Sequence, residues 1–314
     1  MTRVLVTGAD GFVGRHLCRD LIASGHKVVG SVRVERSTQN SCALIPVGDI
    51  GDRTDWEQAL AGVSTVVHLA ARVHVMRETA SDPEKAFRDV NLHGTINLAR
   101  QAALKGVEQF IYLSTVKVNG ERTFTTPFTA NDAPLPEDAY AQSKWEAEQA
   151  LWKIAEKTEM DIIVIRPPLI YGAGAKGNLL RLMALINKGI PLPFAAIRNK
   201  RSLLNVHNLT HFINICLGHP VASGQTYMIS DSMDLSTPEL VSKLAKAMAC
   251  RPKLFSLPVN LLRLAGALTG RAAIVDRLCG NLQVDIAKNH DLLDWSPPFG
   301  VDEGLSEMAR WVNQ

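Results

Sequence analysis

Residues 4–14 read Val4-Leu5-Val6-Thr7-Gly8-Ala9-Asp10-Gly11-Phe12-Val13-Gly14, a short β-branched run that leads into three equally spaced glycines. Between a strand and a helix, Gly8 permits a tight turn, Gly11 lets the backbone approach a pyrophosphate, and Gly14 lets the helix pack close to the strand. The helix N-terminus then offers free N–H groups and a positive dipole end to the phosphates. The run therefore predicts a loop that binds a dinucleotide.

The rest of the first half alternates apolar runs with helical patterns. The predicted strands are 3–7, 27–32, 44–47, 65–69, 109–114 and 161–166. The predicted helices are 11–24, 54–61, 84–105 and 139–158. The strands are β-branched and almost continuously apolar, as strands buried on both faces should be. This alternation is typical of an α/β fold with a doubly wound parallel Rossmann sheet.

The second half is dominated by helical patterns separated by Pro-rich segments. The predicted helices are 177–189, 207–218, 236–250, 258–268, 284–290 and 302–312. One strand-like run at 226–229 is expected to return to the main sheet. We therefore expect a dinucleotide-binding Rossmann domain over 1–167 with a returning segment near 201–231. A smaller, mostly helical substrate domain is expected over 168–314.

The composition excludes several classes of protein. The 314 residues carry 34 basic and 31 acidic side chains, and a net charge of +3 gives no reason to invoke nucleic acid or an anionic membrane. No run of about 18 apolar residues is present, so no membrane insertion is expected. A strand pattern begins at Val4, which leaves no room for a signal peptide. The five cysteines lack CxxC spacing and indicate free thiols, no metal site and a cytoplasmic location.

The end of the second predicted strand bears on which dinucleotide is bound. A carboxylate at that position accepts hydrogen bonds from the adenosine ribose of NAD, but this sequence reads Val32-Arg33. Arg33, with Arg36 nearby, is suited to pair with a 2′-phosphate, which favours NADP over NAD. Asp49-Ile50 follows the third strand, where the aspartate is expected to meet the adenine amino group.

A second motif indicates proton-transfer chemistry. Tyr140 and Lys144 lie four residues apart and so share one face of the helix predicted over 139–158. Lowering a tyrosine pKa from about 10 to about 7 requires about 4 kcal/mol of preferential phenolate stabilisation. An ammonium such as that of Lys144 is expected to supply much of it, together with an oxidised nicotinamide ring. Ser114 and Thr115 end a predicted strand at the sheet edge where ligands bind, and offer hydroxyls to position the substrate oxygen.

These motifs together resemble those of the extended short-chain dehydrogenase/reductases, within the NAD-dependent epimerase/dehydratase group. The family pattern Thr-Gly-x-x-Gly-[Phe/Tyr]-x-Gly is matched at 7–14. Further likeness lies at 49, 68–71, 91–95, 166–172, 201–209 and 293–297, and so covers almost the whole chain. The long helices predicted at 84–105 and 139–158 resemble the pair through which such proteins form a homodimer.

The resemblance implies a set of site residues. Those implied to be catalytic are Thr115, Tyr140 and Lys144. Those implied to bind the cofactor are Gly8, Gly11, Phe12, Val13, Arg33, Asp49, Ile50, Leu69, Ala70, Ala71, Asn91, Ser114, Tyr140, Lys144 and Pro167. Those implied to bind a nucleotide-diphosphate sugar are Thr115, Lys117, Tyr140, Asn178, Arg201 and Arg277. Guanidinium groups suit the diphosphate because they make bidentate, charge-assisted contacts.

The resemblance leaves several reactions open. Sugar-nucleotide 4,6-dehydratases of the family use two acids after the catalytic threonine, and this chain has Val116-Lys117 there, which excludes a dehydratase. An NADPH-dependent reductase is favoured by Arg33. It is also favoured by the resemblance of residues 114–121 and 138–145 to enzymes of bacterial polysaccharide loci. Its expected substrate is a UDP-4-keto-6-deoxy-N-acetylhexosamine of cell-surface polysaccharide (O-antigen) biosynthesis.

Two alternatives are kept beside the reductase. One is a 4-epimerase of a UDP-hexose, such as UDP-glucose or UDP-N-acetylglucosamine, that retains NAD and returns the hydride to the other face of the ketone. The other, from a different class, is a non-catalytic module that senses a dinucleotide. Such modules commonly lose the tyrosine or the lysine, whereas this chain keeps both Tyr140 and Lys144.

Overall fold

The main sheet of the molecule is parallel throughout. The computed structural model describes residues 2–35, 42–73 and 82–313, and within these residues the sheet has seven strands in the order β3-β2-β1-β4-β5-β6-β9. The strands are β1 (Arg3–Thr7), β2 (Lys27–Val32), β3 (Ala43–Pro46), β4 (Thr65–His68), β5 (Gln109–Leu113), β6 (Asp161–Arg166) and β9 (Gln225–Met228). Because the chain winds outward from β1 in both directions, the predicted doubly wound α/β fold is confirmed.

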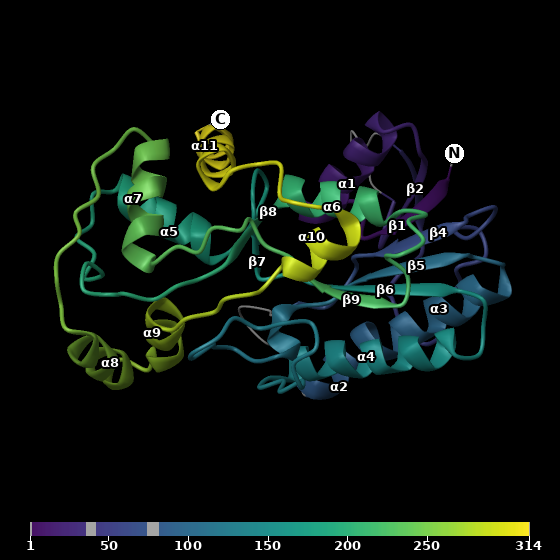
Figure 1. Cartoon of the computed structure of the whole chain (residues 1–314), viewed down its shortest axis with the longest axis horizontal. Helices are drawn as coiled ribbons and strands as arrows, with labels where there is room; N and C mark the ends of the chain where they lie inside the picture. The colour runs from purple at the N-terminus through teal and green to yellow at the C-terminus, as the bar shows by residue number, and fades with distance from the viewer. Residues whose placement is uncertain (1, 36–41, 74–81, 314) are drawn as a thin grey trace.

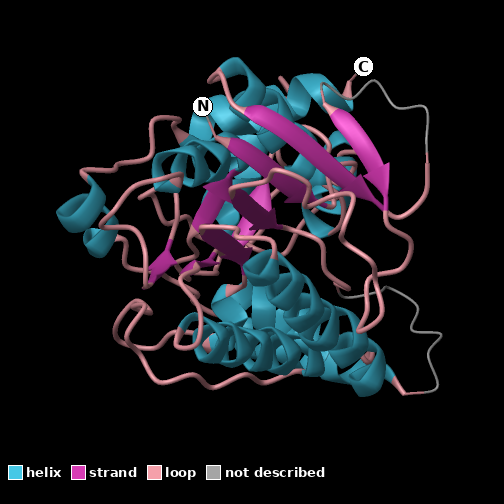
Figure 2. Cartoon of the chain, turned by 90° about the vertical axis from the view of Figure 1, so that its right-hand side faces the viewer, coloured by secondary structure: helices cyan, strands magenta, loops and turns pink. Residues whose placement is uncertain are grey.

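Helices cover both faces of this sheet (Figures 1 and 2). The helices on one face are α1 (Phe12–Ala23), α6 (Val206–Cys216) and α10 (Ala287–Leu293), and those on the other are α3 (Thr95–Leu104) and α4 (Ala139–Ala155). Side chains alternate along a strand, so Val6 joins the first core with Leu17, and Leu5 joins the second with Leu98. The strands are therefore apolar on both sides, as their sequences predict.

The second half of the chain builds a smaller body beside the carboxyl edge of the sheet. Its elements are β7 (Leu169–Tyr171), β8 (Leu203–Asn205), α5 (Asn178–Asn187), α7 (Thr237–Ala247), α8 (Val259–Leu268), α9 (Ala272–Cys279) and α11 (Val301–Val312). The chain returns to the main sheet at β9, where Thr226 lies opposite Val164 of β6. The parallel pair β7–β8 and the helix α9 were not predicted; three-residue strands are too short to show a periodic pattern.

One predicted helix of the first half is wrong, and another is helical but not α-helical throughout. Residues 54–61 form turns, in which Trp56 and Leu60 are buried, so that their four-residue spacing imitates a helix. The helix predicted over 84–105 is instead α2 (Pro83–Arg88), a π-helical segment η1 (Asp89–Gly94) and α3. A Cβ on Gly94 would lie 2.5 Å from the side chain of Ile50, so the chain here passes close to the loop after β3. Such π segments are frequent at functional sites.

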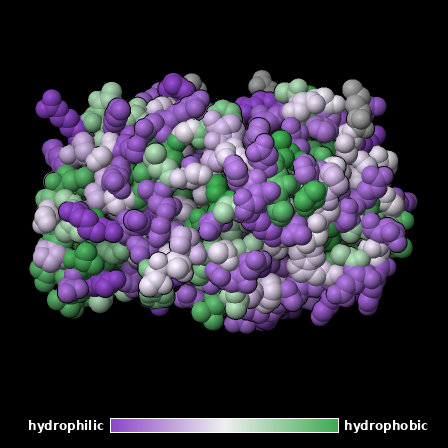
Figure 3. Space-filling model, viewed as in Figure 1, coloured by the Kyte–Doolittle hydropathy of each residue, from purple (hydrophilic) through white to green (hydrophobic). Residues whose placement is uncertain are grey.

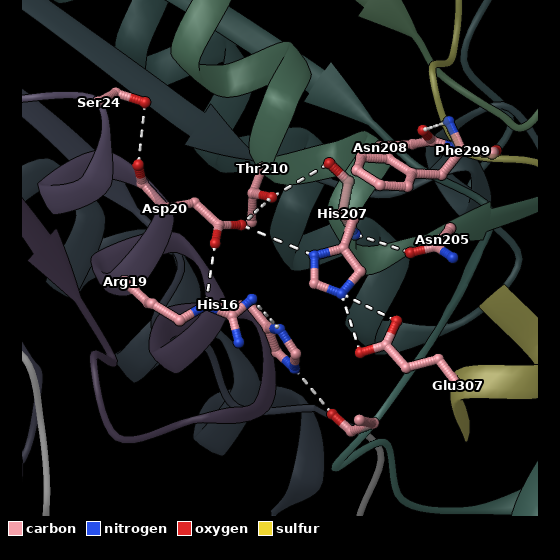
Figure 4. A network of polar contacts seen from close by, with 11 residues as sticks. His16, Arg19, Asp20, Ser24, Asn205, His207, Asn208, Thr210, Phe299 and Glu307 are labelled. Atoms are coloured by element: carbon pink, nitrogen blue, oxygen red, sulfur yellow. Dashed lines mark hydrogen bonds and ion pairs between the residues drawn. The ribbon is translucent and has the colours of Figure 1, made fainter. Parts of the chain in front are cut away.

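A polar network joins the two halves of the chain (Figure 4). His207 on α6 places Nε2 3.0 Å from the carboxylate of Glu307 on α11, and its Nδ1 lies 3.8 Å from that of Asp20 on α1. His16, one turn before Asp20, contacts the carbonyl of Ala173 at 2.8 Å in the loop before α5. The contact with Asp20 raises the pKa of His207, so the two carboxylates favour the protonated imidazole between them. The helix that follows the glycine loop is thus tied to the second half of the chain.

Candidate active site

The loop between β1 and α1 has the shape that a pyrophosphate requires. Gly8 has φ of +64°, a left-handed conformation that favours glycine. A Cβ on Gly14 would lie 2.2 Å from the carbonyl oxygen of Gly8, so a larger residue would displace the loop. Gly11 precedes α1, whose first turn begins with Phe12 and Val13 and contains no acidic side chain. This geometry fits the diphosphate of a dinucleotide at the helix N-terminus.

The two charged residues predicted to bind the adenosine bind one another. Arg33 follows β2 and Asp49 follows β3, and Nε of the arginine lies 2.7 Å from Oδ1 of the aspartate. Both side chains are largely exposed to solvent. Ile50 packs beside Gly94 of η1, while Arg36 lies outside the described residues. A 2′-phosphate that approached Arg33 would therefore meet a carboxylate as well as a guanidinium.

A buried chain of hydrogen bonds fixes the loop after β4. Oγ1 of Thr7 accepts the N–H groups of Leu69 and Ala70, each at 3.0 Å, and contacts Nδ1 of His68 at 2.8 Å. Nε2 of His68 contacts the hydroxyl of Thr95 at 3.0 Å. Burial lowers the pKa of His68 to about 3, so the imidazole is neutral and bridges β4 to α3. The ends of β1 and β4 are held side by side next to the loop predicted to bind a dinucleotide.

Asn91 connects this loop to the helix that carries the tyrosine. Its side chain accepts the N–H of Arg72 at 2.8 Å and donates to the carbonyl of Arg72 at 3.0 Å, which fixes the chain directly after Ala71. The same amide group donates to the hydroxyl of Ser143 at 3.0 Å, and that hydroxyl donates to the carbonyl of Tyr140 at 2.7 Å. Asn91 therefore positions both the predicted cofactor loop and the start of α4.

One face of α4 carries the predicted chemistry toward the carboxyl edge of the sheet. Asp138 caps the helix, since Oδ1 accepts a backbone N–H three residues on at 2.7 Å. Tyr140, Lys144 and Glu148 follow at four-residue spacing and share one face. Lys144 and Glu148 are buried, and the ring of Tyr140 packs edge-on against Phe87 of α2 with centroids 6.0 Å apart. The predicted pair is thus placed on one helix face at the sheet edge.

The surroundings of Tyr140 raise its pKa, so the lowering expected from Lys144 and an oxidised nicotinamide stays a prediction. Burial raises the pKa of Tyr140, and the carboxylate of Asp138 raises it further. Lys144 lies over the ring of Tyr112 with Nζ 4.0 Å from the centroid, and burial lowers its own pKa to about 7. Burial disfavours the charged form of each group, so it raises the pKa of the phenol and lowers that of the ammonium. A cationic ring bound nearby is needed to lower the pKa of Tyr140.

Ser114 faces a buried ion pair rather than open solvent. Its hydroxyl donates to the carboxylate of Glu148, which is fully buried. Arg166, at the end of β6, donates to the same carboxylate through Nε at 3.1 Å and NH2 at 2.5 Å. Arg166 also donates to Oδ1 of Asn119 at 3.0 Å. The Ser114 side chain is therefore engaged in holding β5, β6 and α4 together beside the site.

Thr115 lies at the end of β5, two residues before a lysine that makes two ion pairs. Thr115 caps the 3₁₀ turn η2 (Val116–Val118). The N–H of Val116 donates to the carbonyl of Pro167 at 2.9 Å. Nζ of Lys117, the next residue but one, contacts Glu121 at 2.5 Å and Asp138 at 2.6 Å. Lys117 therefore neutralises the carboxylate that caps α4. The two acids are held by this lysine.

The predicted diphosphate residues lie in the second half of the chain. NH1 of Arg201 donates to the carbonyls of Arg277 and Gly280 at 2.9 and 3.1 Å. Burial lowers the pKa of Arg201 and the positive charge of Arg277 lowers it further, so the two cations repel. Nε of Arg277 lies 4.0 Å from Glu121, and Asn178 is exposed at the start of α5. An anion between the two arginines would relieve this repulsion.

A comparison with models of protein families matches residues 4–230 of this chain to the NAD dependent epimerase/dehydratase family. The matched region runs from the strand before the glycine loop to the end of the main sheet and includes Thr115, Tyr140 and Lys144. The chain belongs to this family. It is an NAD(P)-dependent enzyme of the short-chain dehydrogenase/reductase fold, and the non-catalytic alternative is set aside.

Curated members of this family are similar to the chain over its whole length. A UDP-glucose 4-epimerase of Vibrio cholerae is 42% identical over 309 residues, which is 98% of this chain and 94% of that protein. A protein of Escherichia coli O157:H7 named N-acetyl-alpha-D-glucosaminyl-diphospho-ditrans,octacis-undecaprenol 4-epimerase is 29% identical over 326 residues, with 98% and 94% covered. The relatives share the name of 4-epimerase but differ in the group that carries the sugar.

Solved structures of epimerase/dehydratase family enzymes have the same fold. UDP-glucuronic acid 4-epimerase from Bacillus cereus in complex with NAD has a TM-score of 0.80 at 21% identity, with 100% of this chain and 99% of that chain covered. MoeE5 in complex with UDP-glucuronic acid and NAD has a TM-score of 0.81 at 25% identity, with 99% of each chain covered. The likeness extends through both halves of the chain.

The epimerase/dehydratase site also contains residues that sequence reasoning missed. Glu148 and Asp138 were not predicted, although both carry charges on α4 next to Tyr140 and Lys144. The four-residue spacing from Tyr140 through Lys144 was a signal for Glu148, while Asp138 had the signal of a helix cap. Arg166 was seen as part of a family motif without a role. Among the described residues, no group of three or more His, Cys, Asp or Glu side chains is arranged to hold a metal ion.

Proposed function

We propose that this protein is a 4-epimerase of a UDP-hexose that works through a retained NAD. The observation that carries the proposal is the 42% identity, over 98% of this chain, to a UDP-glucose 4-epimerase. The carrier is UDP in that relative and in the ligands of the solved structures, whereas the 29% identical relative is named for a diphospho-undecaprenol sugar. UDP is therefore the carrier that we propose.

The site residues have distinct tasks in this reaction. Tyr140 takes the proton of the C4 hydroxyl and returns it, and Thr115 donates or accepts a hydrogen bond at the same oxygen. Lys144, buried beside Tyr112, supplies a positive charge below the reacting groups and a donor to the nicotinamide ribose. A nicotinamide held at the glycine loop and beside Lys144 would supply the acceptor for the C4 hydride and its return to the other face of the ketone. Much of the rate comes from holding these groups in contact.

The contacts of Lys117 support the exclusion of a dehydratase. Elimination of water needs free carboxyl groups beside the substrate, and the two acids near Thr115 are Glu121 and Asp138. Both are held by Nζ of Lys117, at 2.5 and 2.6 Å, and Asp138 also caps α4. Each carboxylate therefore has one oxygen bound to this shared ammonium, and the second oxygen of Asp138 is taken up by the cap.

The 4-ketoreductase remains the alternative, and one pair of assays separates the two reactions. The purified protein is incubated with UDP-glucose without added cofactor, and UDP-galactose is measured by chromatography. In parallel it is given a UDP-4-keto-6-deoxy-N-acetylhexosamine with NADPH, and the loss of absorbance of the reduced cofactor is followed. Interconversion in the first assay supports the epimerase. Turnover confined to the second assay would overturn it in favour of the reductase.

The proposed NAD is tested by freeing Arg33. Asp49→Asn removes the carboxylate that now pairs with this arginine at 2.7 Å, so the guanidinium becomes available to a 2′-phosphate. Because the pair is exposed, we expect the affinity for NADP to rise by up to about fivefold relative to that for NAD, since loss of the predicted adenine contact would affect both nucleotides equally. Fluorescence titration of the nucleotide-free protein measures both constants. Arg33→Ala is the matched variant, and it should weaken NADP alone. Tighter binding of NADP than NAD by the unmodified protein would support the preference expected from sequence.

The proposed diphosphate contact is tested at Arg277. We expect Arg277→Met to raise KM for the UDP-sugar by about tenfold at nearly unchanged kcat, because a charge-assisted contact to substrate is lost. The guanidinium is about half exposed and lies only 4.0 Å from Glu121, so the fold does not depend on it. Arg271→Met, at the other end of the same helix, is the control. Steady-state kinetics measure KM for both variants. Equal KM values for Arg277→Met and Arg271→Met would contradict the assignment of Arg277 to the diphosphate.

We also propose a homodimer that meets through α3 and α4, and a cytoplasmic location. Leu104 at the end of α3 is 86% exposed, so it is available for such a contact. A mass near twice 34.3 kDa by light scattering is the result expected for the dimer, and Leu104→Lys should reduce it. A mass of one chain would contradict it. Among the described residues, no helix is long and apolar enough to cross a membrane.

A further inference from the structure

The hairpin formed by α8 and α9 exposes an apolar surface that the proposed reaction does not use. On α8, Leu261, Leu264 and Leu268 are 51%, 55% and 79% exposed, and their spacing puts them on one face of the helix. Ile274 of α9 is 55% exposed and extends this surface. Hydrophobic side chains gather over the two helices at the lower left of Figure 3. We call these four side chains the hairpin patch.

Tight packing within the hairpin shows that the patch is held in place. A Cβ on Gly266 of α8 would lie 2.7 Å from the side chain of Val275 on α9, so the two helices meet at close range. The N–H of Arg271 donates to the carbonyl of Gly266 at 2.7 Å. The far end of α9 is tied to α7, because the hydroxyl of Thr237 donates to the carbonyl of Leu278 at 2.6 Å. The leucines are therefore exposed on a hairpin that is packed firmly against the rest of the fold.

The charge around the patch differs from that of the rest of the molecule. Residues 251–277 contain five Arg or Lys and one Asp, a net charge of +4, whereas the whole chain carries +3 and the remainder therefore −1. The single acid, Asp276, lies 3.3 Å from Arg263. An apolar stripe bordered by basic side chains is the pattern of helices that lie among the headgroups of anionic membranes. A second copy of the chain docked on the same patch would instead bring two basic segments together.

We propose that the hairpin patch docks this protein on an anionic phospholipid bilayer. The leucines and Ile274 would enter the interface, and the surrounding arginines would meet lipid phosphates. The helices of 10 and 8 residues are about 15 and 12 Å long, so they lie on the bilayer and do not cross it. The net charge of the whole chain conceals this local asymmetry. Arg277 lies on α9, so docking also brings the proposed diphosphate site to the membrane surface, a consequence that rests on the proposed function.

Vesicle sedimentation tests the docking surface on the full chain without any sugar substrate. The probes are vesicles of phosphatidylcholine alone and of phosphatidylcholine mixed with phosphatidylglycerol. We expect the protein to sediment with the mixed vesicles only, and to be released by salt. Leu264→Glu with Leu268→Glu should abolish sedimentation. Removing Arg263 and Arg271 by substitution with Gln should lower the partition coefficient by about fivefold for each charge.

The control is Val221→Glu with Val312→Glu. These half-exposed apolar residues lie outside the hairpin, and the change adds the same two negative charges. The control should sediment like the unmodified protein. Equal sedimentation of the Leu264/Leu268 variant and the control would overturn the proposal. Failure of the unmodified protein to bind the mixed vesicles would also overturn it. Dissociation of a dimer in the Leu264/Leu268 variant alone would show instead that the patch joins two copies of the chain. Turnover of UDP-sugar in the same samples reports on the proposed function separately.

Discussion

Tyr140→Phe is expected to lower kcat for interconversion of the UDP-sugar by about 10²–10⁴-fold. The substitution removes the hydroxyl that we propose to exchange a proton with the sugar, and it leaves the ring against Phe87, with centroids 6.0 Å apart. Burial and the nearby carboxylate of Asp138 raise the pKa of this tyrosine in the free protein. The cost of ionising it is therefore met only in the complete complex, where positive charge from the cofactor is close.

Steady-state kinetics with circular dichroism as a check of folding measure this effect. Tyr227→Phe is the matched control, because this tyrosine lies on β9 and its hydroxyl makes a long 3.5 Å contact with the carbonyl of Val221. It should keep kcat within experimental error. A Tyr140→Phe enzyme that is folded and as fast as the unmodified protein would contradict the proton-transfer role. Loss of activity in both variants would point to general damage.

The glycine loop and the tyrosine–lysine pair were accessible to sequence reasoning because each depends on local geometry. A turn with φ of +64° at Gly8 and a close approach at Gly14 require glycine whatever the rest of the chain does. Spacing of four residues likewise places Tyr140 and Lys144 on one face of any helix. The parallel sheet follows from alternation of strands and helices, since parallel strands need crossover connections.

What the sequence left undetermined depends on contacts between distant segments. The pKa of Lys144 is lowered to about 7 because the fold encloses it against Tyr112, and helix spacing alone carries no information on enclosure. Arg33 looked free to bind a phosphate until β3 brought Asp49 to 2.7 Å. The π-helical segment η1 lies where Gly94 passes close to Ile50, a contact across 44 residues of chain. Local sequence patterns do not predict such long-range contacts.

Glu148→Leu is expected to reduce the free energy of unfolding by about 3–5 kcal/mol, the largest stability effect that we predict. The carboxylate is fully buried and accepts from the hydroxyl of Ser114 and from Nε and NH2 of Arg166, which is itself 4% exposed. Removing it leaves the guanidinium charge buried with one amide partner, Asn119. An unpaired buried charge is much less stable than either the intact pair or no charge at all.

Urea unfolding of three variants separates this effect from a general loss of packing. Glu148→Leu with Arg166→Met removes both charges and should recover most of the lost stability. Glu146→Leu is the matched control: it lies on the same helix, and its partner Arg88 at 2.9 Å is 40% exposed, so its loss should cost about 1 kcal/mol or less. If the double variant is no more stable than Glu148→Leu alone, the cost arises from the shape of the cavity and not from the stranded charge of Arg166.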